Sequence, residues 1–111
     1  MSFSGRRKDK GHKSFVMLPR KMIRRDQWKE LSPAAKLFYI QLKGKYNGYN
    51  NGTINLYYSE LRGNKGISSP STISKASREL EEKGWIKRTK LGGMYRYSNE
   101  YELTGKYDDY T

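Results

Sequence analysis

The chain has 111 residues and no cysteine, and its 23 lysine and arginine residues outnumber 11 aspartate and glutamate residues, for a formal net charge of +12. This length fits one domain with a modest core, and the lack of cysteine excludes a disulfide scaffold, thiolate catalysis and zinc-finger chemistry. No apolar run is long enough to span a membrane, and the N-terminus has no apolar segment of a secretory signal, so we expect a cytoplasmic protein.

The positive charge is concentrated near the N-terminus. Residues 1–25 hold nine basic residues and one acidic residue, a net charge of +8, whereas residues 26–111 contribute only +4. An excess of positive charge attracts polyanions such as DNA, RNA and acidic membranes. Residues 1–14 are expected to form a flexible basic arm, because they offer little to bury. Two interpretations of this arm stay open: a solubilising tail, or a segment that lies along DNA phosphates or enters a minor groove.

The first predicted elements are short. Residues 15–18 form an apolar run that ends at Pro19, a pattern typical of an edge strand or an extended anchor. Residues 21–30 are expected to form a short helix. The inward-facing residues of that helix are expected to be Met22, Ile23 and Trp28.

A long central helix is predicted next. Ser32 is a favourable N-cap, and Pro33 suits the first helical position because no N–H is needed there. The apolar residues that follow cover most of the helix circumference, which is typical of a buried helix. The helix is expected to stop near Tyr46, because residues 47–52 are a run of turn formers.

A short strand, a short helix and a second long helix are predicted next in chain order. Residues 53–56 are expected to form a short strand, and residues 58–62 a short helix. A second Ser-Pro pair, beginning at Ser69, starts a helix that is expected to run to Lys83 and to end at Gly84.

This last helix has two different faces at a helical spacing of about 100° per residue. One face carries Ile73, Ala76, Ser77 and Leu80. The opposite face carries Ser71, Lys75, Arg78 and Glu82. We therefore expect one face to pack and the other to remain outside.

A basic hairpin closes the predicted domain. Residues 85–91 are strand-like, a Gly-Gly pair supplies a tight reversal, and residues 94–97 and 101–103 form the returning strand. Residues 105–111 are polar, and we expect a frayed C-terminal tail.

The order of these elements predicts a helix-turn-helix followed by a β-hairpin wing. The fold class is α+β, with a three-helix core and a small antiparallel sheet. In such a fold the first helix of the pair supports the second, whose outer face can enter a major groove about 12 Å wide. The N–H groups at the start of the second helix suit phosphate, and the hairpin can reach the neighbouring backbone.

Five groups of residues carry a resemblance to a known family. They are Trp28 with Leu31-Ser32 and Ala35, Tyr46-Asn47-Gly48 with Asn50-Asn51-Gly52, Ile67-Ser68 with Thr72-Ile73-Ser74, residues 78–86, and residues 100–104. Through them, residues 15–104 resemble the winged helix-turn-helix domains of bacterial plasmid and phage replication proteins. The resemblance implies sequence-specific binding of double-stranded DNA, in replication initiation or transcription regulation of a plasmid, phage or other mobile element. A location at the nucleoid or a plasmid follows from that role.

The resemblance also implies which residues contact DNA. Those of the second helix are Ser69, Ser71, Thr72, Lys75 and Arg78. Those of the hairpin are Lys87, Arg88, Lys90 and Arg96. The helix cations suit guanine O6 and N7 or phosphate, and the hydroxyls suit phosphate or a base edge, although capping is the more common use of Ser69. The hairpin cations are expected to contact phosphate, because we expect no acidic residue in the hairpin to offset them.

Two alternatives to duplex binding stay open. A protein-interaction module would use the acidic surface of Glu79, Glu81 and Glu82. Binding of single-stranded DNA or RNA would use Tyr95 and Tyr97 for base stacking. If the duplex hypothesis holds, Glu79 and Glu82 restrict close approach to the N-terminal half of the helix.

An enzyme is not expected, because no nucleophile has a plausible orienting base. We also expect no cofactor, no metal, no membrane contact and no small-molecule substrate. A homodimer stays open as a possibility, since a palindromic DNA site would imply two-fold symmetry.

Overall fold

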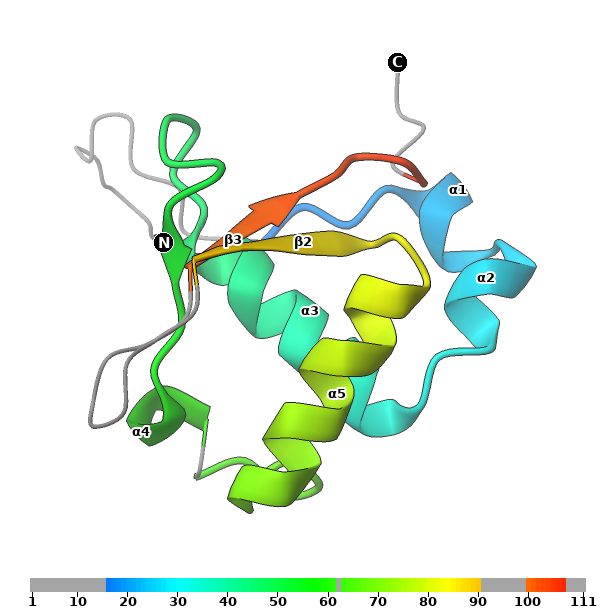
Figure 1. The fold of residues 1–111 in the computed structure, drawn as a ribbon. Coiled ribbons are helices and arrows are strands. Elements are labelled where there is room, and N and C mark those ends of the chain that lie inside the picture. The colour runs from blue at the N-terminus through cyan, green and yellow to red at the C-terminus, as the bar shows by residue number, and fades with distance from the viewer. Residues whose placement is uncertain (1–15, 62, 91–99, 108–111) are drawn as a thin grey trace, which may run out of the picture.

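The computed structural model describes residues 16–61, 63–90 and 100–107. Its helices are α1 (Arg20–Ile23), α2 (Asp26–Lys29), α3 (Pro33–Lys45), α4 (Tyr58–Leu61) and α5 (Pro70–Glu82). Its strands are β1 (Ile54–Asn55), β2 (Ile86–Lys90) and β3 (Glu100–Leu103) (Figure 1). This combination confirms the predicted α+β class and is consistent with a winged helix-turn-helix.

Several predicted features lie outside the described residues. They are the basic arm at residues 1–14, Phe15, Arg62, Leu91, the Gly-Gly reversal, residues 94–97 and the end of the C-terminal tail. Three DNA-contact or stacking predictions belong to this group, namely Tyr95, Arg96 and Tyr97. The second part of the returning strand is described, and β3 contains the predicted residues 101–103.

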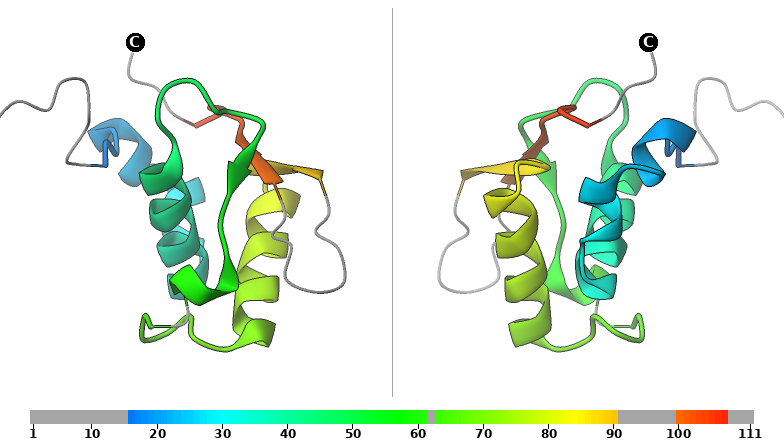
Figure 2. Two further views of the ribbon diagram at one scale, coloured as in Figure 1. Left: turned by 90° about the vertical axis from the view of Figure 1, so that its left-hand side faces the viewer. Right: turned by 90° about the vertical axis from the view of Figure 1, so that its right-hand side faces the viewer.

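The three strands form one antiparallel sheet in the order β1-β3-β2. Ile54 of β1 pairs with Tyr101 of β3, and Ile86 of β2 pairs with Leu103. All four side chains are buried, so one face of the sheet belongs to the core. Figure 2 shows α3 and α5 side by side, with the sheet across one end of the pair.

The central helix forms as predicted. Ser32 is the N-cap of α3, and its hydroxyl accepts a hydrogen bond from the Ala35 N–H at 3.1 Å. Pro33 occupies the first turn, and the helix ends with Tyr46 as the C-cap. Its buried residues are Ala35, Phe38, Tyr39 and Leu42. The helix therefore lies in the middle of the core, in agreement with its apolar circumference.

Asparagine side chains brace the loop between α3 and β1. The Asn47 side-chain oxygen accepts from the backbone N–H groups of Tyr49 and Asn50 at 2.9 and 3.1 Å. The Asn51 amide accepts from the Leu103 N–H at 2.7 Å and donates to its carbonyl at 3.0 Å. The Asn51 side chain thus continues the contact with β3 beyond the last paired residues, Ile54 and Tyr101. The Asn-Gly run that predicted a turn also ties that turn to the sheet.

The N-terminal prediction is wrong in two details. Residues 21–30 form α1 and α2 rather than one helix, and Ile23 is 38% exposed instead of turned inward. Met22 and Trp28, which are both buried, would lie about 120° apart on one straight helix. The extended backbone at Arg25 breaks the helix and lets both side chains reach the core.

The chain before α1 is an anchor rather than a strand. Residues 16–18 have no strand structure, and Leu18 packs against the core. Pro19 is buried and its carbonyl accepts from the Met22 N–H at 3.0 Å, which starts α1. Of the two predicted forms of this apolar run, the extended anchor is confirmed.

Aromatic side chains join the elements of the core. Trp28 of α2, Tyr39 of α3 and Trp85, which precedes β2, contact one another edge to face, with ring centroids 5.4–5.8 Å apart. Phe38 of α3 meets Tyr101 of β3 in the same way at 5.6 Å. Such pairs add to the stabilisation from buried apolar area. The aromatic contacts therefore join α2 and α3 to the sheet and to the residue that precedes β2.

An ion pair links α4 to the end of α3. Lys45 Nζ lies 2.5 Å from one carboxylate oxygen of Glu60, and the Tyr57 N–H donates to the other at 2.8 Å. Burial acts to raise the pKa of the Glu60 carboxyl. The hydrogen bonds from Lys45 and Tyr57, with the charge of Lys45, outweigh burial and hold this pKa below its ordinary value.

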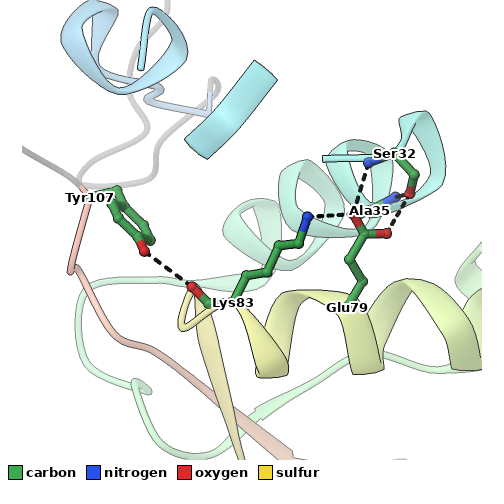
Figure 3. A network of polar contacts seen from close by, with 5 residues as sticks. All are labelled: Ser32, Ala35, Glu79, Lys83 and Tyr107. Atoms are coloured by element: carbon green, nitrogen blue, oxygen red, sulfur yellow. Dashed lines mark hydrogen bonds and ion pairs between the residues drawn. The ribbon is translucent and has the colours of Figure 1, made fainter. Parts of the chain in front are cut away.

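A carboxylate of α5 links the two long helices. Ser32 donates from its backbone N–H and its hydroxyl to the two carboxylate oxygens of Glu79, at 2.9 and 2.7 Å (Figure 3). Lys83 Nζ lies 3.8 Å from the same carboxylate, and the Tyr107 hydroxyl donates to the Lys83 carbonyl at 3.2 Å. A negative charge at a helix N-terminus is favourable, and hydrogen bonds to an ionised group are strong. Glu79 therefore fixes where α5 crosses α3.

In the described part of the chain, no helix is both long and apolar enough to span a membrane.

The aromatic cluster generates the first prediction. Trp28→Ala is expected to lower the free energy of unfolding by about 3–5 kcal/mol, because it removes a large buried side chain and leaves a cavity. Urea denaturation followed by circular dichroism measures this change. Tyr49→Ala is the control, since Tyr49 is 95% exposed and its loss is expected to cost less than about 0.5 kcal/mol. Equal losses in both variants would contradict the described core.

The link between α3 and α5 generates the second prediction. Glu79→Gln keeps the side-chain shape but removes the charge and turns one acceptor into a donor. We expect a loss of about 1–3 kcal/mol in the free energy of unfolding, because the Ser32 N–H and hydroxyl lose an ionised partner. Glu82→Gln removes the same charge from an exposed position on the same helix. A similar loss in both variants would show that Glu79 has no special role.

Candidate nucleic-acid interface

The helix-turn-helix consists of α4, the turn after it and α5. Ile67 in the turn is completely buried, so the turn is anchored in the core. Ser69 caps α5: its hydroxyl accepts from the Thr72 N–H at 3.2 Å and donates to the Thr72 hydroxyl at 2.8 Å. Both hydroxyls thus have a structural role at the start of the helix. Capping, the more common use of Ser69, is confirmed.

The two predicted faces of α5 are present in the structure. Ala76, Ser77 and Leu80 are buried, and Ile73 is partly buried against the core. The predicted outer face is exposed at all four positions: Ser71, Lys75, Arg78 and Glu82. Within the described ranges, neither Lys75 nor Arg78 forms an ion pair. Their positive charges are therefore available to a ligand outside the protein.

A half-open cleft of about 270 Å³ lies between α5 and the sheet. Arg78 from α5 and Arg88 from β2 both line it, and Ser74, Ser77 and Tyr101 place hydroxyl groups around it. The Ser77 and Tyr101 hydroxyl oxygens lie 3.3 Å apart in the buried part. The cleft thus brings one predicted helix cation and one predicted hairpin cation to the same place.

The alternation of side chains along β2 separates the hairpin cations. Ile86 is buried and Arg88 lines the cleft, so the side chain between them, Lys87, belongs to the other face of the sheet. Lys87 is exposed, and its Cα pairs with that of Glu102. Among the predicted hairpin cations, Arg88 therefore lies at the cleft together with Arg78 of α5. Lys87 lies on the opposite face of the sheet.

The expectation that no acid offsets the hairpin cations is wrong. Glu81 of α5 lies 3.2 Å from the Arg88 guanidinium. Within the hairpin itself, antiparallel pairing sets Glu102 opposite Lys87. Glu102 belongs to β3, and cross-strand neighbours of opposite charge attract. Lys75 and Arg78 of α5, in contrast, are exposed and form no ion pair within the described ranges.

Three residues with hydroxyl groups line the cleft but were not predicted as functional, namely Ser74, Ser77 and Tyr101. Glu81, which pairs with Arg88, was predicted only as part of the acidic surface of the protein-interaction alternative. A signal existed for Ser74, because it precedes Arg78 by four residues and so lies beside it on the helix. For Tyr101 and Glu81 the relevant neighbour is Arg88, which only the pairing of β2 with β3 and its packing on α5 bring close.

The acidic surface required by the protein-interaction alternative is largely used inside the domain. Glu79 bonds to Ser32, and Glu81 pairs with Arg88. Glu82 is the exposed one of the three, and it has no ion pair within the described ranges. One exposed carboxylate gives little surface for a basic partner.

Comparisons with known proteins agree with this geometry. A family model described as a helix-turn-helix domain matches residues 29–86, from α2 through α3, α4 and α5 to the first residue of β2. Neither the curated proteins nor the solved structures give a match. The matched range covers more than half of the chain and includes the turn, the capped helix and its exposed cations. A helix-turn-helix of this kind indicates DNA binding, and the chain belongs to the helix-turn-helix domain family.

Proposed function

We propose that this protein binds double-stranded DNA as a winged helix-turn-helix, with α5 in the major groove and the hairpin of β2 and β3 along the neighbouring backbone. The supporting observation is the outer face of α5, where Lys75 and Arg78 are exposed and unpaired within the described ranges. Sequence-specific recognition follows from cations on a helix that the turn and the core hold in a fixed position.

The spacing on α5 suits a groove. Ser71, Lys75 and Arg78 lie four and three residues apart, so they form one row along the helix. An α-helix with side chains is about 10–12 Å across, close to the width of the major groove. Arg and Lys are the usual partners of guanine O6 and N7, and each good contact discriminates between bases.

The biological role that we propose is replication initiation or transcription regulation of a plasmid, phage or other mobile element. Support comes from the resemblance of residues 15–104 to replication-type winged domains, which includes the loop at residues 46–52. Under this proposal the protein acts through binding alone, without a catalytic step or a cofactor. Residues 1–14 would add positive charge beside the duplex as a basic arm.

The third prediction tests the role of α5. Duplexes that the protein binds are first selected from random sequences, and affinity is then measured by fluorescence anisotropy on a selected and a scrambled duplex. The double variant Lys75→Ala with Arg78→Ala is expected to lose about tenfold or more on the selected duplex and to lose most of its sequence preference. The slope of log K against log salt is expected to fall by about 0.9 for each phosphate contact removed.

A matched control removes the same charge from a different surface. Lys21→Ala with Lys29→Ala takes two exposed cations from α1 and α2. This variant is expected to keep its preference for the selected duplex. Equal losses of affinity in the two double variants would show that only the overall charge matters, and would contradict the proposal. Stronger competition by single-stranded than by duplex oligonucleotides would favour the single-strand alternative instead.

A further inference from the structure

We propose that the cleft between α5 and β2 is a binding site for one phosphate of the DNA backbone, and that Glu81 competes with this phosphate for Arg88. The inference rests on the proposed duplex binding and adds a specific site and a control element to it. It follows from the lining of the cleft and from the ion pair at its edge.

The chemistry of the cleft suits a phosphate. Arg78 and Arg88 supply two guanidinium groups from two different elements, and Ser74 adds an exposed hydroxyl. Among the described residues that line the cleft, none is acidic. Arginine presents several N–H donors in a planar fork that matches phosphate oxygens. Two such forks at one opening favour an anion with several acceptor oxygens over a neutral ligand.

The position of the cleft suits the DNA backbone rather than a base edge. The outer face of α5 is exposed, and the cleft lies to one side of it, where residues of α5 and of the sheet line it together. If the row of Ser71, Lys75 and Arg78 enters a groove, the strand that borders the groove passes along the sides of α5. A backbone phosphate is therefore the anion that reaches this opening.

The ion pair at the edge gives Arg88 two competing partners. Its guanidinium lies 3.2 Å from Glu81, and both side chains are about one-third exposed or less. Pairing keeps the guanidinium at the cleft when no DNA is bound. A phosphate that enters must replace the carboxylate or share the guanidinium with it, and the two negative groups repel each other. Glu81 thus pre-positions Arg88 and at the same time lowers the affinity for DNA.

The size of this effect follows from the type of ion pair. Partly exposed pairs contribute little to stability, so replacing the carboxylate is expected to be easy rather than prohibitive. Glu81→Gln is therefore expected to raise the affinity for duplex DNA about two- to fivefold. Because the contact is to phosphate, the increase is expected to be the same on selected and scrambled duplexes.

The fourth prediction is a double-mutant cycle between Glu81 and Arg88. Arg88→Gln is expected to weaken binding to all duplexes, and Glu81→Gln is expected to lose its effect in the Arg88→Gln background. Glu82→Gln is the matched control, since Glu82 is the next residue of α5 and the substitution removes the same charge from an exposed side chain. Its small increase in affinity is expected to be equal in both backgrounds. Unfolding midpoints of all variants are measured alongside.

A second measurement locates the phosphate. Single phosphates of the selected duplex are replaced by uncharged methylphosphonates, one at a time. The position that faces the cleft is expected to weaken binding of the unaltered protein clearly more than binding of Arg88→Gln, which keeps only Arg78 at the cleft. If no position shows this difference, or if Glu81→Gln behaves like Glu82→Gln in both backgrounds, the phosphate site is wrong. The proposed function would still stand if Lys75→Ala with Arg78→Ala weakened binding, and would fail separately if it did not.

Discussion

The packing of α5 against α3 is the interaction on which the candidate interface depends. Ala76 and Leu80 bury the inner face of α5, and the bonds from Ser32 to Glu79 fix its position along α3. A helix that presents cations to a groove must be held from behind, because a small rotation would turn Lys75 or Arg78 toward the protein. The carboxylate of Glu79 supplies this constraint at the same point where it satisfies the N-terminus of α3. Stability and orientation of the interface therefore come from one set of contacts.

Several acidic side chains form ion pairs or hydrogen bonds within the domain, and this leaves cations exposed on its surface. Glu60 pairs with Lys45, Glu79 with the start of α3, and Glu81 with Arg88. Each contact neutralises a carboxylate close to the core or between elements. Lys75 and Arg78 on the exposed face of α5 form no ion pair within the described ranges, although Glu82 lies on the same face. These internal contacts thus leave Lys75 and Arg78 as exposed cations on the outer face of α5.

Local sequence signals predicted the elements that depend on local chemistry. The two Ser-Pro pairs marked the starts of α3 and α5, since a capping hydroxyl acts within three residues. The helical spacing of apolar and polar residues predicted the buried and the exposed face of α5, because this pattern is also local. The contact between Ser32 and Glu79 joins residues 47 positions apart, and no local sequence pattern predicts that these two residues meet. The cleft was missed in the same way, because it exists only where α5 packs beside the paired strands.

The distribution of charge along α5 also restricts how the helix can approach DNA. Lys75 and Arg78 occupy its second and third turns, whereas Glu82 is exposed in its last turn. A phosphate near the last turn would meet a carboxylate and the negative end of the helix dipole together. A phosphate near the second turn would meet Lys75 and lie closer to the positive end. If α5 enters the major groove as proposed, its N-terminal half must therefore lie deeper than its C-terminal half. The cleft is lined by residues of α5 from Pro70 to Arg78, so the proposed backbone contact lies beside the same turns of the helix as the proposed base contacts.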